Sequence, residues 1–417
     1  MNNLQAEILT IGNEVISGLI QDTNARKLAS RLNEIGVWVS RFTSIGDDRA
    51  AILEEIKRIL SRSDILIITG GLGATHDDIT KAVLAEYFEQ PLVHNERVHS
   101  MVESFFKKRG KPIKDRILSQ AEVPEGATVL FNEKGTAPGF LFKDGNRKVF
   151  ALPGVPLEME HLLETWVVPE LEGEGKSTIV HRVLNTTGIS ESALWDKTGP
   201  VADFEKGVSI ASLPSHLGVR IRLTAKGNTK ETLVADLDRA EASLRDCLQH
   251  YIYSVDGETL EEVVGGLLRE RKYTLATAES CTGGLISSRI TRVPGSSDYF
   301  KEGAVTYSNQ AKMERLSVPS KILDDHGAVS EPVAAAMARG IRLASDSDIA
   351  VSVTGIAGPG GGSADKPVGL TFIAVSDKEG EFVEQHVFHQ DRGRNQDRAA
   401  QAALNLVRLR LSGEKLE

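Results

Sequence analysis

A serine stands in a turn whose surroundings could make it a nucleophile. Ser280 lies in the segment Ala278-Glu279-Ser280-Cys281-Thr282-Gly283-Gly284, after a strand-like run and before an apolar-periodic helix. A strand-to-helix turn exposes its serine, and the N–H groups at the start of the helix face negative charge that forms nearby. Acyl transfer needs such a nucleophile and such donors. A serine in this position also commonly caps a helix, so the turn alone leaves both roles open.

A serine nucleophile needs a base, and Lys312 is the best candidate in this part of the chain. The three histidines of the region fall outside the predicted ligand loops: His326, His386 and His389. Lys312 lies about one turn into a predicted helix, and as a neutral, desolvated amine it could serve Ser280. Three arginines could depress its pKa or bind a phosphate: Arg392, Arg394 and Arg398. The alternative is a lysine on an exposed helix face.

Three loops are predicted to bring these residues together. They are the Ser280 turn, the segment 306–312 and the glycine-rich segment 354–362, and each follows a predicted strand. Open α/β sheets bind ligands at the carboxyl ends of their parallel strands. We therefore expect the three loops to share one edge of a sheet.

The rest of the chain also alternates strand and helix patterns. In the first 170 residues this alternation indicates a parallel sheet covered on both faces, whose central strand at 64–69 runs directly into Gly70-Gly71-Leu72-Gly73. A helix is expected at 157–171, and a linker at 172–177 leads to a small α+β module. In that module we interpret Ser-Leu-Pro-Ser-His at 212–216 as a surface turn rather than a catalytic site.

Composition narrows the class of protein. The chain has 417 residues, 41% of them hydrophobic and 26% charged, as expected of two or three globular domains. A net charge of −9 disfavours nucleic acid as a partner of the whole protein. The two cysteines, Cys247 and Cys281, favour a reducing cytoplasm over a disulfide framework. The sequence shows neither a signal peptide nor an apolar run of roughly 20 residues, so we expect a soluble, cytoplasmic protein without a membrane partner.

Four segments of the C-terminal third together resemble the CinA family, whose C-terminal domain is a nicotinamide mononucleotide (NMN) amidohydrolase. The segments are 278–284, Gly-Ala-Val-Thr-Tyr-Ser-Asn-Gln-Ala-Lys at 303–312, Gly-Ala-Val-Ser at 327–330 and Gly-Ile-Ala-Gly-Pro at 355–359. The resemblance implies a serine/lysine hydrolase without a cofactor. Ser280 would attack the carboxamide carbon, and Lys312 would act as base and then as acid toward ammonia.

The same resemblance implies further site residues. Tyr307 and Thr354 would orient the substrate or bind the oxyanion, together with backbone amides. Arg392 matches the arginine of the family's Gly-Asp-Arg segment, a phosphate contact, although Gln390 stands in place of the glycine. Substrate contacts are implied for eight residues: Thr282, Gly283, Gly284, Asn309, Gly355, Gly358, Arg392 and Arg398.

The N-terminal region resembles the family's other catalytic domain, which shares its fold with molybdopterin-binding proteins. The match covers 11–24, 69–80, 135–139 and 152–156. It implies ADP-ribose pyrophosphatase activity with a divalent cation of the Mg, Mn or Co class. Three carboxylates are implied as metal ligands: Asp77, Asp78 and Glu14. Nine residues are implied as substrate contacts: Asn24, Gly70, Gly71, Gly73, Thr75, Gly135, Thr136, Pro153 and Gly154. Asn13 replaces an aspartate that the family often has.

We therefore expect an α/β protein in three parts. These are a molybdopterin-binding-like parallel-sheet domain at 1–172, a KH-like α+β module at 173–252 and an α/β amidohydrolase domain at 253–417. The resemblance implies a bifunctional, homodimeric nucleotide-salvage enzyme that acts on NMN and ADP-ribose. The module shows no clear Gly-x-x-Gly clamp, so RNA binding is not expected. Two alternatives stay open, a pterin-binding protein and a non-enzymatic scaffold.

Overall fold

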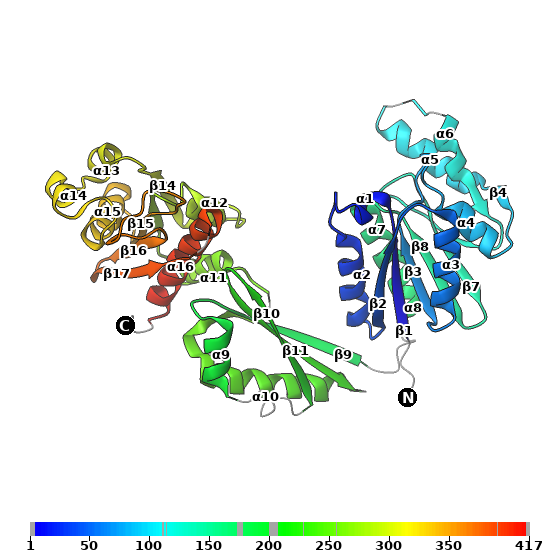
Figure 1. Ribbon diagram of the computed structural model, residues 1–417, viewed down its shortest axis with the longest axis horizontal. Coiled ribbons are helices and arrows are strands. Elements are labelled where there is room, and N and C mark those ends of the chain that lie inside the picture. Colours follow the sequence, from blue (N-terminus) through cyan, green and yellow to red (C-terminus); the bar gives the residue numbers. More distant parts are fainter. Residues whose placement is uncertain are drawn as a thin grey trace. The chain divides into compact units, whose positions relative to one another are not determined.

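The computed structural model forms two compact units (Figure 1). It describes residues 5–110, 112–113, 115–172, 178–199, 207–227, 229–255, 257–389 and 391–413. One unit lies within 1–180 and 226–233, and the other within 181–225 and 234–417.

The first unit contains a six-stranded sheet of order β2-β1-β3-β8-β7-β6. The first four of these strands are parallel, and β7 and β6 extend the sheet in antiparallel fashion. Its elements are β1 (Gln5–Ile11), α1 (Asn13–Ile16), α2 (Thr23–Glu34), β2 (Trp38–Ile45), α3 (Arg49–Leu60), β3 (Ile65–Thr69), α4 (Thr80–Tyr87), β4 (Leu92–His94), α5 (Glu96–Lys108), α6 (Asp115–Leu118), β5 (Glu122–Pro124), β6 (Thr128–Leu130), β7 (Gly139–Asp144), β8 (Arg147–Leu152), α7 (Pro156–Leu162) and α8 (Val168–Leu171).

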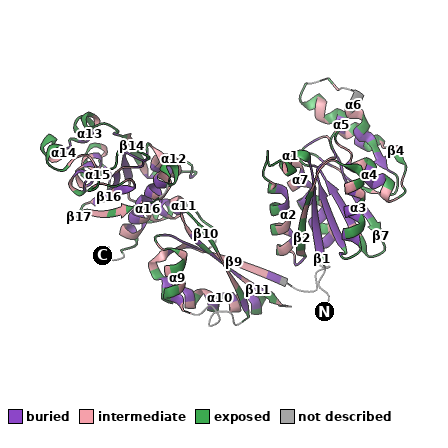
Figure 2. Cartoon of the chain, in the orientation of Figure 1, coloured by how far each residue is buried: buried purple, intermediate pink, exposed green. Residues whose placement is uncertain are grey.

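Both faces of this sheet are covered, so its central strands are apolar throughout. Alternate residues of β1 and β3 pack on α2 and α7 on one face and on α3, α4 and α5 on the other. All five residues of β3 are buried, and the buried colour fills the centre of the sheet in Figure 2. This agrees with the parallel-sheet fold expected for this region.

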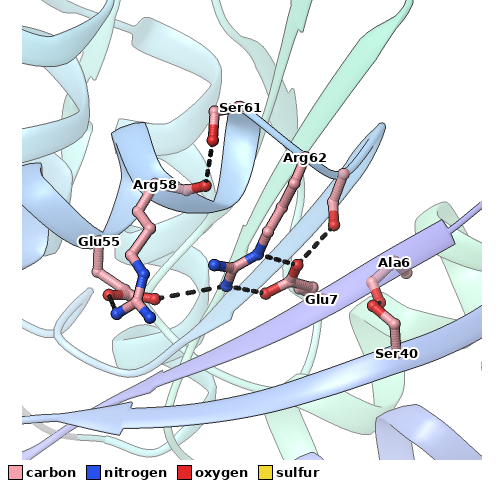
Figure 3. Close-up of polar contacts among 8 residues, drawn as sticks. Ala6, Glu7, Ser40, Glu55, Arg58, Ser61 and Arg62 are labelled. Carbon is pink, nitrogen blue, oxygen red and sulfur yellow. Dashed lines mark hydrogen bonds and ion pairs between the residues drawn. The ribbon is translucent and has the colours of Figure 1, made fainter.

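One charged pair sits at the edge of this core. Glu7 in β1 is almost fully buried, and its carboxylate accepts hydrogen bonds from Arg62 Nε at 2.7 Å and Nη2 at 2.6 Å, and from Ser63 Oγ at 2.7 Å (Figure 3). Burial alone would raise the pKa of Glu7, but these bonds and the positive charge of Arg62 hold that pKa below its ordinary value. The pair ties β1 to the segment that follows α3.

The helix expected at 157–171 is interrupted. The structure has α7, then a π-helical turn at Leu163–Val167, then α8. Pro169 has no N–H to donate to the carbonyl of Thr165, four residues earlier, so a regular α-helix cannot run through this point.

A four-stranded sheet of order β10-β11-β9-β12 lies mostly within the second unit. Its elements are β9 (Thr178–Thr186), α9 (Glu191–Thr198), β10 (Val208–Ser215), β11 (Gly218–Gly227), α10 (Lys230–Leu248) and β12 (Ile252–Ser254). The expected surface turn at 212–216 is mostly strand: β10 runs to Ser215, and only His216 and Leu217 separate it from its antiparallel partner β11.

The remainder of this unit is a five-stranded sheet of order β14-β13-β15-β16-β17. Strands β14, β13 and β15 are parallel, whereas β16 and β17 are antiparallel additions. Helices α11, α12 and α16 pack on one face, and α13, α14 and α15 on the other. The elements are α11 (Leu260–Arg271), β13 (Leu275–Glu279), α12 (Leu285–Thr291), β14 (Phe300–Val305), α13 (Asn309–Leu316), α14 (Ser320–His326), α15 (Glu331–Ser345), β15 (Ile349–Gly355), β16 (Leu370–Asp377), β17 (Gly380–Val387) and α16 (Arg392–Ser412).

Candidate functional site

Three loops meet at the carboxyl edge of the parallel strands in the second unit. The Ser280 turn follows β13, the segment 306–312 follows β14, and the glycine-rich segment follows β15, as the sequence predicted. Backbone bonds hold them in register, from Ser280 N to Val353 O and from Thr306 N to Glu279 O.

Ser280 and Lys312 are in contact, although 32 positions separate them. Nζ of Lys312 lies 3.0 Å from Oγ of Ser280 and donates to the carbonyl of Thr306 at 2.7 Å. Only 1% of the Lys312 surface is exposed, so the alternative of a lysine on an exposed helix face is wrong. Helix α13 carries Lys312 inward, and Ser308 caps that helix by accepting a hydrogen bond from Ala311 N.

Burial shifts the pKa values of Lys312 and of the neighbouring Cys281. Loss of solvent lowers the pKa of the Lys312 ammonium below its ordinary value, because the charged form is poorly solvated there. Burial also raises the pKa of the neighbouring Cys281 thiol to about 12, so this cysteine stays protonated and unreactive. The protonated thiol and the direct contact of Lys312 Nζ with Ser280 Oγ together favour Ser280 over Cys281 as a nucleophile.

The first turn of α12 differs from expectation. Its N–H groups were expected to face the reacting centre, but the buried carboxylate of Glu279 occupies them. Oε2 accepts from Gly284 N at 3.0 Å and Ile286 N at 3.1 Å, and Oε1 accepts from Ser287 N at 2.8 Å and Ser287 Oγ at 2.7 Å. The helix N-terminus is thus already neutralised by the chain itself.

Arg392 joins two of the loops at the site. Its Nη2 donates to Tyr307 Oη at 3.0 Å, and its Nη1 donates to Gly358 O at 2.7 Å. Tyr307 is 61% exposed, so its ring stands at the solvent side of the site. Thr354 is buried and donates its hydroxyl to Ala328 O at 2.8 Å. Gln390, which stands in place of the glycine of the family's Gly-Asp-Arg segment, lies outside the described residues.

The remaining predicted contacts of this region differ in backbone conformation, burial and packing. Gly283 and Gly284 adopt left-handed backbone conformations, with φ of 63° and 100°, that the turn requires. Thr282 is buried, and its hydroxyl has no partner among the described residues. Asn309 is exposed at the start of α13. Gly355 packs so closely on Cys281 Sγ and Leu370 O that a Cβ there would lie 3.1 Å and 2.8 Å from them.

Arg398 is engaged away from this cluster. Its Nε donates to His216 O at 2.9 Å, and its guanidinium stacks over the Phe388 ring. The imidazole of His216 in turn lies 3.0 Å from the carboxylate of Asp397. Asp397 and Arg398 are adjacent in α16, and both contact His216 at the tip of the β10–β11 hairpin, so the structure supports Arg398 as an anchor of that hairpin.

Two residues on α16 were missed from the sequence. Asn395 donates to Ala357 O at 3.0 Å, and Gln396 donates to Cys281 O at 2.7 Å. Together with Arg392 they hold the Ser280 turn and the glycine-rich loop against the start of α16. The sequence signal was their position three and four residues after Arg392, which places all three side chains on one side of a helix.

In the first unit, the loops after β1, β3 and β8 meet at the carboxyl edge of the sheet. The buried side chain of Asn24 donates to Thr69 Oγ1 at 3.0 Å and Gly154 O at 2.8 Å, while Thr69 donates to Pro153 O at 3.0 Å. Gly70 passes so close to the first loop that a Cβ would lie 2.0 Å from Ile11 O, and Gly71 lies against the hydroxyl of Thr80. Five predicted contacts are thus brought together: Asn24, Gly70, Gly71, Pro153 and Gly154.

The acidic segment after β3 is organised around Thr75. Its N–H donates to Asp78 at 2.8 Å, and its hydroxyl lies within hydrogen-bond distance of the carboxylates of both Asp77 and Asp78. The Asp78 carboxylate lies over Gly73. Within the described residues, no cluster of three or more His, Cys, Asp or Glu is close enough to hold a metal, so Glu14 does not join this pair. Two carboxylates still fit Mg²⁺, which is usually held by one or two carboxylates plus substrate phosphates.

Glu158 was missed, and it lies against a predicted contact loop. Its carboxylate packs on Gly135, where a Cβ would lie 2.0 Å away, and it accepts from the buried amide of Asn132 at 2.6 Å. Burial raises the pKa of this carboxyl group above its ordinary value. Thr136 follows Gly135 in the same loop and is half-buried. The sequence signal was a carboxylate four residues after Gly154.

No helix in the described ranges is long and apolar enough to cross a membrane. Family models match three segments: a probable molybdopterin binding domain at residues 7–173, a damage-inducible protein CinA KH domain at 181–254 and a CinA C-terminal domain at 257–411.

Relatives match along nearly the whole chain. A relative from Caldicellulosiruptor bescii is 43% identical over 406 residues, covering 97% of this chain and 99% of its own. A CinA-like protein from Chloroherpeton thalassium is 42% identical, covering 97% and 98%. A crystal structure of the competence/damage inducible protein CihA from Agrobacterium tumefaciens is 38% identical, with a TM-score of 0.36, and covers 37% of this chain and 93% of that one. With three family domains in sequence and relatives this similar over this length, the chain belongs to the CinA family of competence/damage-inducible proteins.

Proposed function

We propose that the C-terminal domain hydrolyses the carboxamide of NMN to nicotinate mononucleotide and ammonia. The observation that carries this proposal is the contact between Ser280 and a buried Lys312 whose pKa is lowered by desolvation. A serine paired with a neutral lysine is suited to acyl transfer. The choice of NMN rests on the resemblance to the family.

The reaction proceeds in two steps. Ser280 Oγ bonds to the carboxamide carbon while its proton passes to Lys312 Nζ, and the C–N bond breaks as that proton moves to the departing ammonia. Water then attacks the acyl-enzyme ester, gives its proton to Lys312 and releases nicotinate mononucleotide, with the proton returning to Ser280. Arg392, whose guanidinium donates to Tyr307 Oη and Gly358 O at the rim of the site, would hold the substrate phosphate.

Replacing the nucleophile tests this proposal. Ser280→Ala should abolish ammonia release from NMN and leave ADP-ribose cleavage intact, because the two sites lie in separate units. Ammonia release is followed with a coupled assay. Ser288→Ala is the matched control, since Ser288 of α12 contacts the turn through its backbone N–H, which the substitution keeps. Loss of both activities, or of neither, would contradict the assignment.

For the N-terminal domain we propose hydrolysis of ADP-ribose to AMP and ribose 5-phosphate. Support comes from the glycine-lined edge at Gly70 and Gly71, the Asn24 amide that bridges two of its loops, and the adjacent Asp77 and Asp78. Asp77 and Asp78 would hold a divalent cation, which when bound neutralises a diphosphate and activates water. The backbone N–H groups of the glycine loop and the amide of Asn24 would orient the phosphates.

A pterin-binding role is the rival for this domain, because the matching family model is that of a molybdopterin binding domain. The discriminating measurement is calorimetric titration of the full chain with ADP-ribose and with a pterin. Tight binding of the pterin alone would reverse the assignment. For the C-terminal domain, a purely structural role is less consistent with the buried Ser280–Lys312 contact, because burying an amine beside a hydroxyl costs solvation free energy.

A further inference from the structure

The backbone around Ser280 has an uneven pattern of hydrogen bonds. Of the eight N–H groups from Ser280 to Ser287, six have an acceptor: Ser280 N, Gly283 N, Gly284 N, Leu285 N, Ile286 N and Ser287 N. The N–H groups of Cys281 and Thr282 have no oxygen acceptor in the described part of the chain, and that of Cys281 contacts only its own thiol sulfur, a weak acceptor. Both residues are buried. Buried N–H groups without a partner are rare, and those beside a nucleophile point to a ligand oxygen.

Glu279 produces this pattern. Its carboxylate is fully buried and accepts the three N–H groups of Gly284, Ile286 and Ser287, which would otherwise be the free donors of α12. The free donors are thereby confined to the two residues directly after Ser280. The residue after a nucleophile supplies an oxyanion donor in other strand–turn–helix hydrolases, for the same geometric reason.

The hydrogen bonds that hold Glu279 in place extend to residues of the sheet. Ser287 Oγ, which donates to Glu279, lies 2.8 Å from the hydroxyl of Thr277, a fully buried residue of β13. Gly303 of β14 passes so close that a Cβ would lie 2.4 Å from Ser287 Oγ. The turn is therefore fixed at its strand end and at its helix end by one carboxylate.

We propose that the N–H groups of Cys281 and Thr282 form the oxyanion-binding site, and that Glu279 is the positioning residue that shapes it. The proposal rests on Ser280 being the nucleophile and is independent of which acyl substrate is bound. In Glu279→Gln the carboxamide has one acceptor oxygen and an NH₂ group that opposes the N–H donors of α12. The turn then loses its anchor while Ser280 and Lys312 remain.

A fluorophosphonate probe tests this without NMN. Ser280 Oγ bonds to phosphorus, the P–F bond breaks, fluoride leaves and the hydroxyl proton passes to Lys312, so the phosphoryl oxygen occupies the oxyanion site. Intact-mass spectrometry of the full chain measures the labelling rate, with Ser280→Ala as the blank. We expect Glu279→Gln to label about 100-fold more slowly, the usual cost of losing oxyanion stabilisation. Glu279→Asp, which keeps both oxygens, should recover part of the rate.

The control is a second helix-capping carboxylate in the same domain. Glu262 accepts from Thr259 N at the start of α11, so Glu262→Gln removes a cap without altering the Ser280 turn and should label like the wild type. Ser287→Ala, which removes one donor to Glu279, serves if Glu279→Gln does not fold, and should show a smaller slowing. Wild-type labelling rates in the folded Glu279 or Ser287 variants would overturn the proposal, and so would absence of labelling in the wild type.

Ammonia release from NMN separates this proposal from the proposed function. With NMN as substrate, kcat should fall in Glu279→Gln while KM changes little, because the oxyanion contact forms only in the transition state. If the wild type labels at Ser280 but releases no ammonia from NMN, the substrate assignment fails and the oxyanion site stands. A rise in KM alone in Glu279→Gln would overturn the positioning role.

Discussion

At the scale of residues, burial gives the candidate site its chemistry. Ser280, Cys281 and Lys312 are all nearly inaccessible to solvent. This loss of solvent lowers the pKa of Lys312 and raises the pKa of Cys281. It favours the neutral amine of Lys312 and the neutral thiol of Cys281. A proton acceptor therefore stands beside the hydroxyl, while the intrinsically better nucleophile is kept protonated.

Lys312→Met should show this balance in two measurements. Ammonia release should fall about a thousandfold or more, since the base is lost. The wild-type pKa of Lys312 is lowered in the native state relative to about 10.4 in the unfolded chain, so folding disfavours the proton and wild-type stability rises with pH up to that value. The melting temperature of Lys312→Met minus that of wild type should therefore be largest near neutral pH and should decrease toward pH ~10.

The wild-type pH–rate profile is the companion measurement. Because the base must be neutral, kcat/KM should rise with pH through the pKa of Lys312 in the free enzyme. Lys321→Met, on the exposed face of α14, is the control and should change neither the profile nor the pH dependence of melting. A pH-independent difference in melting temperature between Lys312→Met and wild type would contradict a buried, neutral lysine.

At the scale of elements, the sequence predicted the parallel strands that carry the site, but it missed the edge strand β17 and the capping of α12 by Glu279. Strands β13 and β15 are buried, largely apolar runs that lead into glycine-rich turns, whereas β14 is a mostly exposed edge strand. Their order along the chain implied a shared edge. Strand β17 was missed because it is a half-exposed edge strand whose polar pattern resembles a loop. The capping by Glu279 was missed because a side chain that folds back on a later helix leaves no periodic signal.

The position of α13 depends on a close approach to α15. A Cβ at Gly340 would lie 2.0 Å from Leu316 O, at the end of the helix that carries Lys312. Gly340→Ala should therefore push α13 outward, destabilise the second unit by about 1–3 kcal/mol and reduce ammonia release. Gly266→Ala on α11 is the matched control: open space surrounds that position, so the substitution should stabilise by about 0.5–1 kcal/mol.

Denaturant unfolding monitored by circular dichroism and by residual ammonia release measures both variants. Equal effects of Gly340→Ala and Gly266→Ala would contradict the role of this contact in placing Lys312. Unchanged ammonia release in a clearly destabilised Gly340→Ala would show that α13 keeps its position against β13.

At the scale of the whole molecule, the two candidate sites belong to separate units and contain different functional groups. The first unit holds the glycine-lined edge with Asp77 and Asp78, and the second holds Ser280 and Lys312. Sequence motifs were sufficient to separate the two regions. The contact between Arg398 and the β10–β11 hairpin was not predictable, because the same arginine also fits a phosphate contact and only the fold shows that His216 reaches it.

This separation predicts how a chelator acts on the full-length protein. EDTA should abolish ADP-ribose hydrolysis and leave ammonia release from NMN unchanged, and added Mg²⁺ or Mn²⁺ should restore the first activity. Asp78→Asn should likewise reduce ADP-ribose hydrolysis by at least tenfold, with a higher Mg²⁺ concentration needed for half-maximal rate, because one of the two carboxylate ligands is lost. Glu14→Gln is the matched variant, since Glu14 lies outside the Asp77–Asp78 pair, and it should keep the wild-type Mg²⁺ dependence. A loss of both activities with EDTA would mean that the sites are coupled or that the second also requires a metal.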